Sequence, residues 1–283
     1  MKITNVTDKN RALTRAEFED LRSLVYKIAW VGKETRPEVS GSASILAQRL
    51  RRATVEDMQI ANRVVKFLRG TASQCITLWK HDINKMHIIS VSDAGGVGSN
   101  DPEPESAVQN AHLVMMTDAK VENGNHTHAS VLMWRSSKCR RVVNSTLAGE
   151  TFVMSTALAD VEWLQVMIAD ILHPEKITPS GPAMRCGVTA VLKRECELSK
   201  RMFHEHVIDA KSVFDFLIKE TAGSKQDRRT SIELAIVREV LQGMSSKIKW
   251  VPHPLMPADT MTHADPAKSN DALSHLMKSG ALV

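Results

Sequence analysis

Apolar residues recur every three or four positions through the first seventy residues, which predicts a series of amphipathic helices. Thr14 and Glu17 have the spacing of a capping box at the start of the first helix. Pro37 breaks the apolar pattern after that helix. The expected helices cover 14–30, 39–50 and 54–70. The N-terminal part, 1–72, is therefore predicted to be a helical segment.

From about residue 75 short runs of β-branched residues replace the helical period. Asn123 and Gly124 form a hairpin-turn dipeptide between two of these runs, so the first three strands are predicted to be an antiparallel meander. Strands are expected at 86–91, 113–117, 127–134, 203–208 and 247–251, and helices at 146–172, 188–202, up to about 220, and 228–242. The pattern predicts an α/β domain over 75–265 and a polar, only partly ordered tail over 266–283.

The composition is that of an ordinary globular protein, with 43% hydrophobic and 24% charged residues. This balance argues against a disordered or fibrous chain. The formal charge of +5 permits a polyanionic partner without requiring one. Four cysteines without a CxxC pair favour reduced thiols over disulfides or a zinc site.

The N-terminus has no apolar core typical of a signal peptide, and we expect no run of about 18 apolar residues long enough to span a membrane. The expected location is therefore intracellular and not secreted, with no membrane partner. Cytoplasm and nucleus both stay open.

Four carboxylates stand at strand ends, at a helix start and after a proline-rich turn: Asp93, Glu150, Asp209 and Asp259. An α/β fold gathers such positions into one site. Clustered carboxylates repel one another unless cations balance them, and Mg²⁺ or Mn²⁺ prefers oxygen ligands. Each acid alone is more typical of a turn or a helix cap.

Five blocks around these acids resemble, in order and spacing, the C-terminal part of a copia-type LTR-retrotransposon Pol polyprotein. They are LRSLVYKIAWVGKETRP with ANRVVKFLRG (21–37 and 61–70), VSDA (91–94), WRSSK with NSTLAGET (134–138 and 144–151), IDAKSVFDFL (208–217) and KWVPHPLMPADTMT (249–262). The similarity covers roughly residues 15–263. It implies the last helices of a reverse transcriptase, its thumb or connection, followed by an RNase H domain.

The resemblance implies an RNase H-like mixed five-stranded sheet, with helices on both sides and the first three strands antiparallel. It assigns Asp93, Glu150, Asp209 and Asp259 as ligands of two Mg²⁺ ions, with Mn²⁺ as a substitute. The implied activity is endonucleolytic cleavage of the RNA strand of RNA–DNA hybrids by a two-metal mechanism. The upstream polymerase part is an implied partner. No polymerase activity is expected, because the chain has no YxDD-like pair and Tyr26 is its only tyrosine.

The blocks also depart from the family pattern. Gly95 and Gly96 stand where the family has an acid and a tryptophan, and His263 replaces a lysine. Two alternatives stay open, one because of these departures and one because another class of nuclease shares the fold and the metals. The first is a catalytically degenerate or domesticated copy that only binds nucleic acid, and the second is an integrase or transposase nuclease.

Several other side chains are weighed for a role. His253, six positions before Asp259, is a candidate for proton transfer or product release. His204 and His206 share one face of a strand and are expected to be surface or core fillers. Candidate phosphate contacts, which could equally be a solvated surface, are Arg63, Lys66, Arg69, Arg140 and Arg141.

Overall fold

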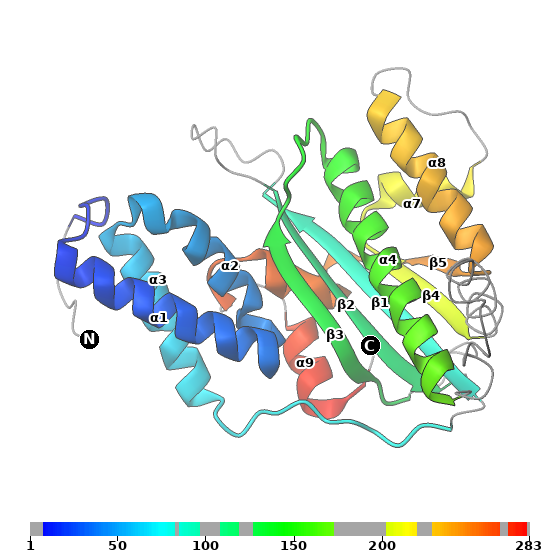
Figure 1. Ribbon diagram of the computed structural model, residues 1–283, viewed down its shortest axis with the longest axis horizontal. Helices are drawn as coiled ribbons and strands as arrows, with labels where there is room; N and C mark the ends of the chain where they lie inside the picture. The colour runs from blue at the N-terminus through cyan, green and yellow to red at the C-terminus, as the bar shows by residue number, and fades with distance from the viewer. Residues whose placement is uncertain are drawn as a thin grey trace, which may run out of the picture.

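The N-terminal part of the chain folds as three helices that pack on one another, drawn in blue in Figure 1. The computed structural model describes residues 8–82, 85–96, 108–118, 127–172, 202–219, 228–266 and 271–281. The helices are α1 (Arg15–Glu34), α2 (Ser40–Arg49) and α3 (Val55–Gly70), with the short 3-10 helices η1 (Pro37–Val39) and η2 (Leu50–Arg52) between them.

The predicted helix starts are confirmed. Glu17 accepts a hydrogen bond from the backbone N–H of Thr14, and Asp57 does the same for Thr54, which completes a capping box at α1 and at α3. Leu21, Val25 and Ile28 of the predicted stripe are buried in the core shared by these helices. We call α1–α3, with η1 and η2, the helical unit.

The second part is built on one five-stranded mixed sheet. Its strands are β1 (Met86–Gly95), β2 (Gln109–Asp118), β3 (Ser130–Lys138), β4 (Phe203–Ile208) and β5 (Lys247–Trp250). The order across the sheet is β3-β2-β1-β4-β5, in which β1, β2 and β3 are antiparallel while β4 and β5 run parallel to β1. This confirms the predicted RNase H-like sheet.

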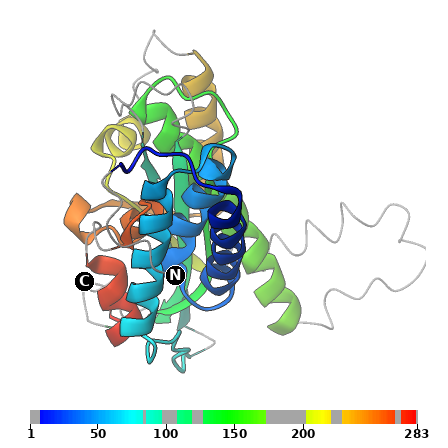
Figure 2. The same cartoon turned by 90° about the vertical axis from the view of Figure 1, so that its left-hand side faces the viewer.

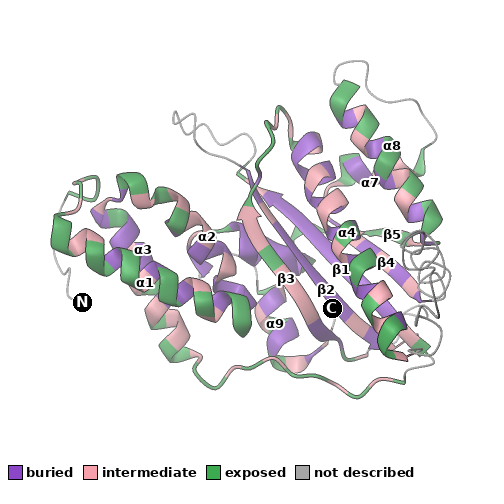
Figure 3. Cartoon of the chain, in the orientation of Figure 1, coloured by how far each residue is buried: buried purple, intermediate pink, exposed green. Residues whose placement is uncertain are grey.

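Helices cover both faces of the sheet, as Figure 2 shows from the side. Alternate residues of β1 point to opposite faces, so Ile88 packs against α4 while Ile89 joins the core on the other face. Figure 3 shows the resulting burial of β1 along nearly its whole length. On one face lie α4 (Thr146–Leu172), α7 (Lys211–Ile218) and α8 (Arg228–Gly243), and on the other η7 (Pro257–Thr262) and α9 (Ala272–Ser279), with η6 (His253–Leu255) before them.

Two helices bear on expectations drawn from the sequence. Within the described ranges one helix, α4, is long and apolar enough to cross a membrane by length and composition alone. It packs against β1, β2 and α8, and the core helices of soluble proteins pass the same test. In the tail, which was expected to be only partly ordered, α9 buries Leu273, Leu276 and Met277 against the sheet. Three apolar residues at helical spacing suffice for that contact. Residues 267–270, 282 and 283 of the tail lie outside the described residues.

Two predicted features lie outside the described residues. These are the turn at Asn123 and Gly124 and all but the last residue of the helix expected over 188–202. The strands β1, β2 and β3 are each longer than predicted, and β1 continues through Asp93 to Gly95. The division of the chain into an N-terminal and a C-terminal domain stays a prediction.

Candidate metal centre

Two of the predicted acids are neighbours at the ends of two parallel strands. Val91 of β1 is paired with Val207 of β4, and Asp93 and Asp209 each lie two residues beyond this pair. Because parallel strands end at the same edge of the sheet, both carboxylates reach the same place. Asp93 is 6% exposed, and the side chain of Asp209 is 9% exposed.

Glu150 comes to the same edge from α4. This helix packs along β1, and Glu150 lies in its N-terminal part, 7% exposed. Carboxylate oxygens of Asp93, Glu150 and Asp209 all lie within 4.8 Å of one another. Three acids that are far apart in the sequence thus form one buried cluster, which we call the three-acid cluster.

Burial and mutual repulsion raise the pKa values of two carboxylates of this cluster. Burial, with the charge of Asp209 added, raises the pKa of Asp93 to about 6. Burial, followed by the charges of Asp93 and Asp209, raises the pKa of Glu150 well above its usual value. Both effects disfavour the ionised carboxylates, and a cation bound among them would offset this cost.

The cluster fits a divalent cation. Oε2 of Glu150 is buried and accepts no hydrogen bond from any residue that the structure describes. A buried carboxylate oxygen without a donor is costly unless a cation occupies that position. The available donors are all carboxylate oxygens, which are the ligands that Mg²⁺ and Mn²⁺ prefer.

Asp259, the fourth predicted acid, lies beside the cluster and not within it. It belongs to η7, and together with Asp93, Glu150 and Asp209 it lines one open hollow of about 390 Å³. Its Oδ1 accepts a hydrogen bond from Nε2 of His263 at 3.1 Å and lies 3.4 Å from Nε2 of His253. The structure thus gathers all four acids around one hollow and surrounds the fourth with imidazoles.

Both imidazoles carry raised pKa values because they donate to carboxylates. The hydrogen bond from His253 to Asp209 raises the pKa of His253, and the hydrogen bond to Asp259 raises that of His263. The side chain of His253 is 63% exposed, so this imidazole lies at the mouth of the hollow.

The predicted phosphate contacts are divided between two places. Lys66 and Arg69 are exposed on α3. Arg63, on the same helix, donates from Nε to Oδ2 of Asp265 at 2.7 Å. Its ion pair with Asp265 gives Arg63 a structural role that the sequence pattern did not indicate.

The other two predicted cations, Arg140 and Arg141, are exposed between β3 and α4. Arg141 lies 3.1 Å from Oε2 of Glu233 and stacks over the ring of Phe152. Arg140, also exposed, lies next to it in the connection before the helix that carries Glu150.

Sequence reasoning missed one polar residue at the site. Oγ1 of Thr262 lies 3.0 Å from Oδ2 of Asp93, and this contact lowers the pKa of Asp93 against the effect of burial. Thr262 is three residues after Asp259, and that spacing was its only signal in the sequence.

His204 and His206 are fully buried, so of the two expectations only the core position holds. His206 is hydrogen bonded to Ser90 and Ser92, and His204 to Ser90 and Ser246. Burial lowers the pKa of His204 to about 3 and that of His206 well below its usual value. Neutral imidazoles thus connect β1 to β4 behind the acids.

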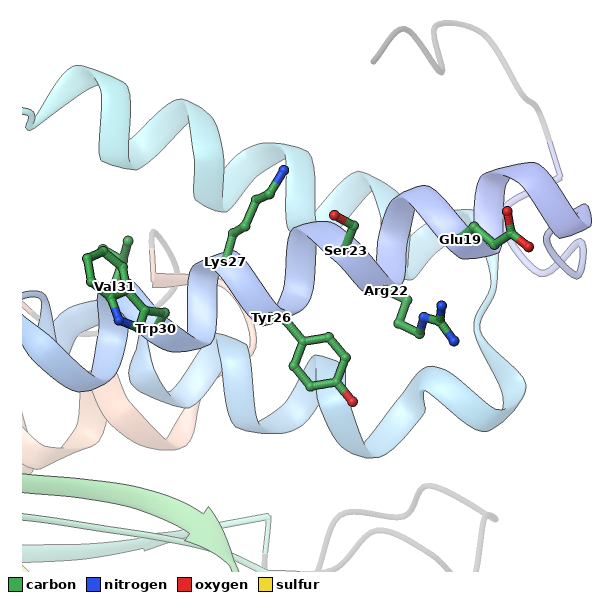
Figure 4. A pocket seen from close by; sticks show the side chains of 7 residues that line it. All are labelled: Glu19, Arg22, Ser23, Tyr26, Lys27, Trp30 and Val31. Atoms are coloured by element: carbon green, nitrogen blue, oxygen red, sulfur yellow. The ribbon is translucent and has the colours of Figure 1, made fainter.

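A larger open hollow, of about 820 Å³, lies along the outer face of α1 (Figure 4). Tyr26 and Trp30 are 64% and 69% exposed there. Glu19 is the one acid among its seven lining residues, and none of these is a histidine. The chemistry that can hold a metal ion is therefore at the smaller, acidic hollow.

Comparison with known proteins gives one curated relative. The chain is 25% identical over 137 residues to the retrovirus-related Pol polyprotein from transposon RE1 of Arabidopsis thaliana. The match covers 48% of the chain and 8% of that polyprotein, so the chain spans only a small part of its relative. No family model matches the chain.

Two solved structures are also similar. RNase H1 from the halophilic archaeon Halobacterium salinarum NRC-1 matches with a TM-score of 0.32, 14% identity, and coverage of 66% of this chain and 98% of that one. The N-terminal RNase H domain of rv2228c from Mycobacterium tuberculosis matches with a TM-score of 0.33, 14% identity, and coverage of 69% and 99%. The sequence match and the observed sheet make this chain similar to the RNase H region of a retrotransposon Pol polyprotein.

Proposed function

We propose that the chain is a metal-dependent endonuclease of the RNase H class that cleaves the RNA strand of RNA–DNA hybrids. The three-acid cluster is the single observation that carries this proposal. Its carboxylates come from β1, α4 and β4, lie within 4.8 Å of one another, and include an oxygen of Glu150 without a hydrogen-bond donor. Burying three carboxylates together lowers the stability of a fold unless a cation compensates their charge.

In this proposal Asp93, Glu150 and Asp209 hold Mg²⁺, and Asp259 completes the ligand set for a second ion. Such ions, when bound, supply an activated water and stabilise the departing 3′ oxygen of a phosphodiester. The protein contributes the fixed positions of the carboxylates, because β1 and β4 are hydrogen bonded to each other and α4 packs across them. Preorganised ligands of this kind need no rearrangement during the reaction.

His253 is proposed to move protons at the mouth of the hollow. Its ring contacts both Asp209 and Asp259, and its exposure lets it turn toward solvent or a departing product. The hydrogen bond to Asp209 raises the pKa of His253, so this imidazole retains a proton that it can donate. It therefore suits proton transfer or product release.

The proposed substrate is a nucleic-acid duplex, read by its shape and backbone with little base specificity. All five predicted cations are exposed, and Arg63 and Arg141 are held in ion pairs with Asp265 and Glu233. We therefore assign the phosphate contacts to Lys66, Arg69 and Arg140. The proposed location is intracellular, and an upstream polymerase part of the same polyprotein is a proposed partner.

The proposal is tested with a labelled RNA–DNA hybrid incubated with the full chain in Mg²⁺, in Mn²⁺ and in EDTA. Asp209→Asn should abolish cleavage and leave hybrid binding largely unchanged. Asp215→Asn is the matched control, because Asp215 lies on α7 in an exposed ion pair with Lys219. Cleavage that survives Asp209→Asn would refute the assignment.

The same experiment separates the alternative of a catalytically degenerate copy that only binds nucleic acid. A folded chain that binds the hybrid in EDTA but cleaves nothing in either metal would support that alternative. Metal-dependent cleavage of the RNA strand would exclude it.

A further inference from the structure

The segment that carries the fourth acid is buried between the sheet and the helical unit. All six residues of η7 are buried. It packs against β1 and β2 on one side and against α2 and η1 of the helical unit on the other. A short 3-10 helix of this kind has little stability of its own, so its neighbours decide where it lies.

Thr262, at the end of η7, joins two of the acids. Its Oγ1 lies 3.0 Å from Oδ2 of Asp93 and 2.8 Å from the backbone oxygen of Asp259. The hydroxyl hydrogen can be donated to either acceptor. The contact with Asp93 links a strand residue to a residue 169 positions later in the chain.

Two glycines make this close approach possible. A Cβ atom at Gly95, at the end of β1, would lie 2.6 Å from Cβ of Thr262. A Cβ atom at Gly41, in α2, would overlap the backbone oxygen of Met261. Each glycine thus allows η7 to approach closely, because a larger side chain at either position would displace the segment.

Hydrogen bonds fix the same segment from the sheet and connect the sheet to the helical unit. Ser136 of β3 donates from Oγ to the backbone oxygen of Met261 at 2.6 Å. Gln109 of β2 donates to Oγ of Ser136 and to Oγ of Ser44 in α2, at 2.7 Å and 3.0 Å. The ion pair of Arg63 with Asp265 then anchors the chain just beyond η7 to α3.

We propose that Thr262 is a positioning residue for the metal centre, and that the helical unit sets its position through the contact of Gly41 with Met261. The proposal rests on the proposed metal-dependent function. The helical unit then supports the nuclease site structurally, in addition to any contact that it makes with nucleic acid. Thr262 orients the Asp93 carboxylate so that one oxygen remains directed at the cation, as outer hydrogen bonds orient metal ligands in general.

The test is Mn²⁺ affinity, measured by electron paramagnetic resonance on the full chain without substrate. Thr262→Val keeps the shape and removes the hydroxyl, and it should weaken Mn²⁺ binding about 10- to 100-fold. Thr262→Ser keeps the hydroxyl and should bind Mn²⁺ nearly as the unchanged chain does. A purely packing role would give the opposite order, because valine preserves the buried volume and serine does not.

Gly41→Ala tests the contribution of the helical unit. It should weaken Mn²⁺ binding, whereas Gly70→Ala, at a position with no atom within 4 Å of the added carbon, should not. Circular dichroism in EDTA establishes that each variant is folded. If Gly41→Ala does not fold, Ser44→Ala takes its place with the same expectation, because it removes the hydrogen bond from Gln109 to α2.

The outcomes separate the two proposals. Tight Mn²⁺ binding by the unchanged chain together with equally tight binding by folded Thr262→Val would overturn the positioning role alone. Failure of the unchanged chain to bind Mn²⁺ would overturn the metal centre itself, and the positioning role with it. Equal Mn²⁺ affinity of Gly41→Ala and Gly70→Ala would show that the helical unit does not set the position of Thr262.

Discussion

Nδ1 of His253 donates a hydrogen bond to Oδ2 of Asp209 at 2.7 Å, across 44 residues of sequence. The imidazole lies on η6 and the carboxylate at the end of β4, two elements connected by the last strand of the sheet. Trp250 of that strand donates from Nε1 to the backbone oxygen of Asp209 at 2.8 Å. Strand β5 therefore brings the histidine to the acid.

Replacing His253 with alanine should slow hybrid cleavage by about 10- to 100-fold, at or below the low end of the range for proton transfer by a side chain. Stability should change little, because the side chain is largely exposed. Single-turnover and steady-state cleavage rates are the measurement. His275→Ala, in which an exposed histidine of α9 is removed, is the control. Equal rates for the two variants would contradict a role for His253.

The raised pKa of Asp93, about 6 against an ordinary value of 3.8, predicts a pH-dependent cost to stability. The folded chain keeps a proton that the unfolded chain loses, so this contribution falls as pH rises from about 4 to about 6. The cost above that range is on the order of 3 kcal/mol. In EDTA, the unfolding free energy of Asp93→Asn should therefore increase relative to that of the unchanged chain as pH rises. Urea unfolding at several pH values measures this gain, and a constant difference would contradict it.

Removing the charge of Glu150 should stabilise the metal-free chain. Glu150→Gln relieves repulsion within the three-acid cluster, and the expected gain in unfolding free energy in EDTA is on the order of 1 kcal/mol. Mg²⁺ should raise the melting temperature of the unchanged chain and that of the variant much less. Thermal unfolding with and without Mg²⁺ tests both parts. A loss of stability in EDTA would show that the cluster needs no cation.

Arg63 and Lys66 lie one turn apart on α3, and their substitutions should have different effects. Arg63→Ala breaks the ion pair with Asp265 and should lower the unfolding free energy by up to about 1 kcal/mol. Lys66→Ala should leave stability unchanged and weaken hybrid binding at every sequence. It should also lower the slope of log affinity against log salt concentration by about one, the contribution of one phosphate contact. Hybrid affinity against salt concentration, with urea unfolding beside it, separates the two. Identical effects would contradict the division.

Ser90 should be a stability hot spot behind the acids. Ser90→Ala leaves Nε2 of His204 and Nδ1 of His206 without their partner and should cost about 1–3 kcal/mol. Both imidazoles have lowered pKa values, so the unfolded chain binds more protons and this contribution to stability is lost as pH falls below about 6.5. In His204→Gln, the unfolding free energy should fall less steeply as pH decreases. An unchanged pH profile would exclude protonation of this histidine.

The sequence alone predicted most of the local structure. Apolar period, capping boxes and β-branched runs depend on neighbouring residues, so they indicated the three N-terminal helices, the five strands and α4. The resemblance to retrotransposon Pol blocks then indicated the four acids together, which periodicity could not do. The structure gathers these acids at one hollow, while their roles stay a prediction.

Other features depend on contacts between distant segments, which leave no local signal. The burial of α9 needs an open apolar face of the sheet, and the ion pair of Arg63 needs Asp265 just beyond η7. In the sequence, Asp93 and Asp259 are equivalent candidates. The packing of η7 between α2 and the sheet decides that Asp259 lies beside the three-acid cluster, whereas Asp93 is a member of it. The sequence determined the elements and the candidate acids, and tertiary packing decided how those acids divide, because the positions of their side chains depend on backbone contacts made far along the chain.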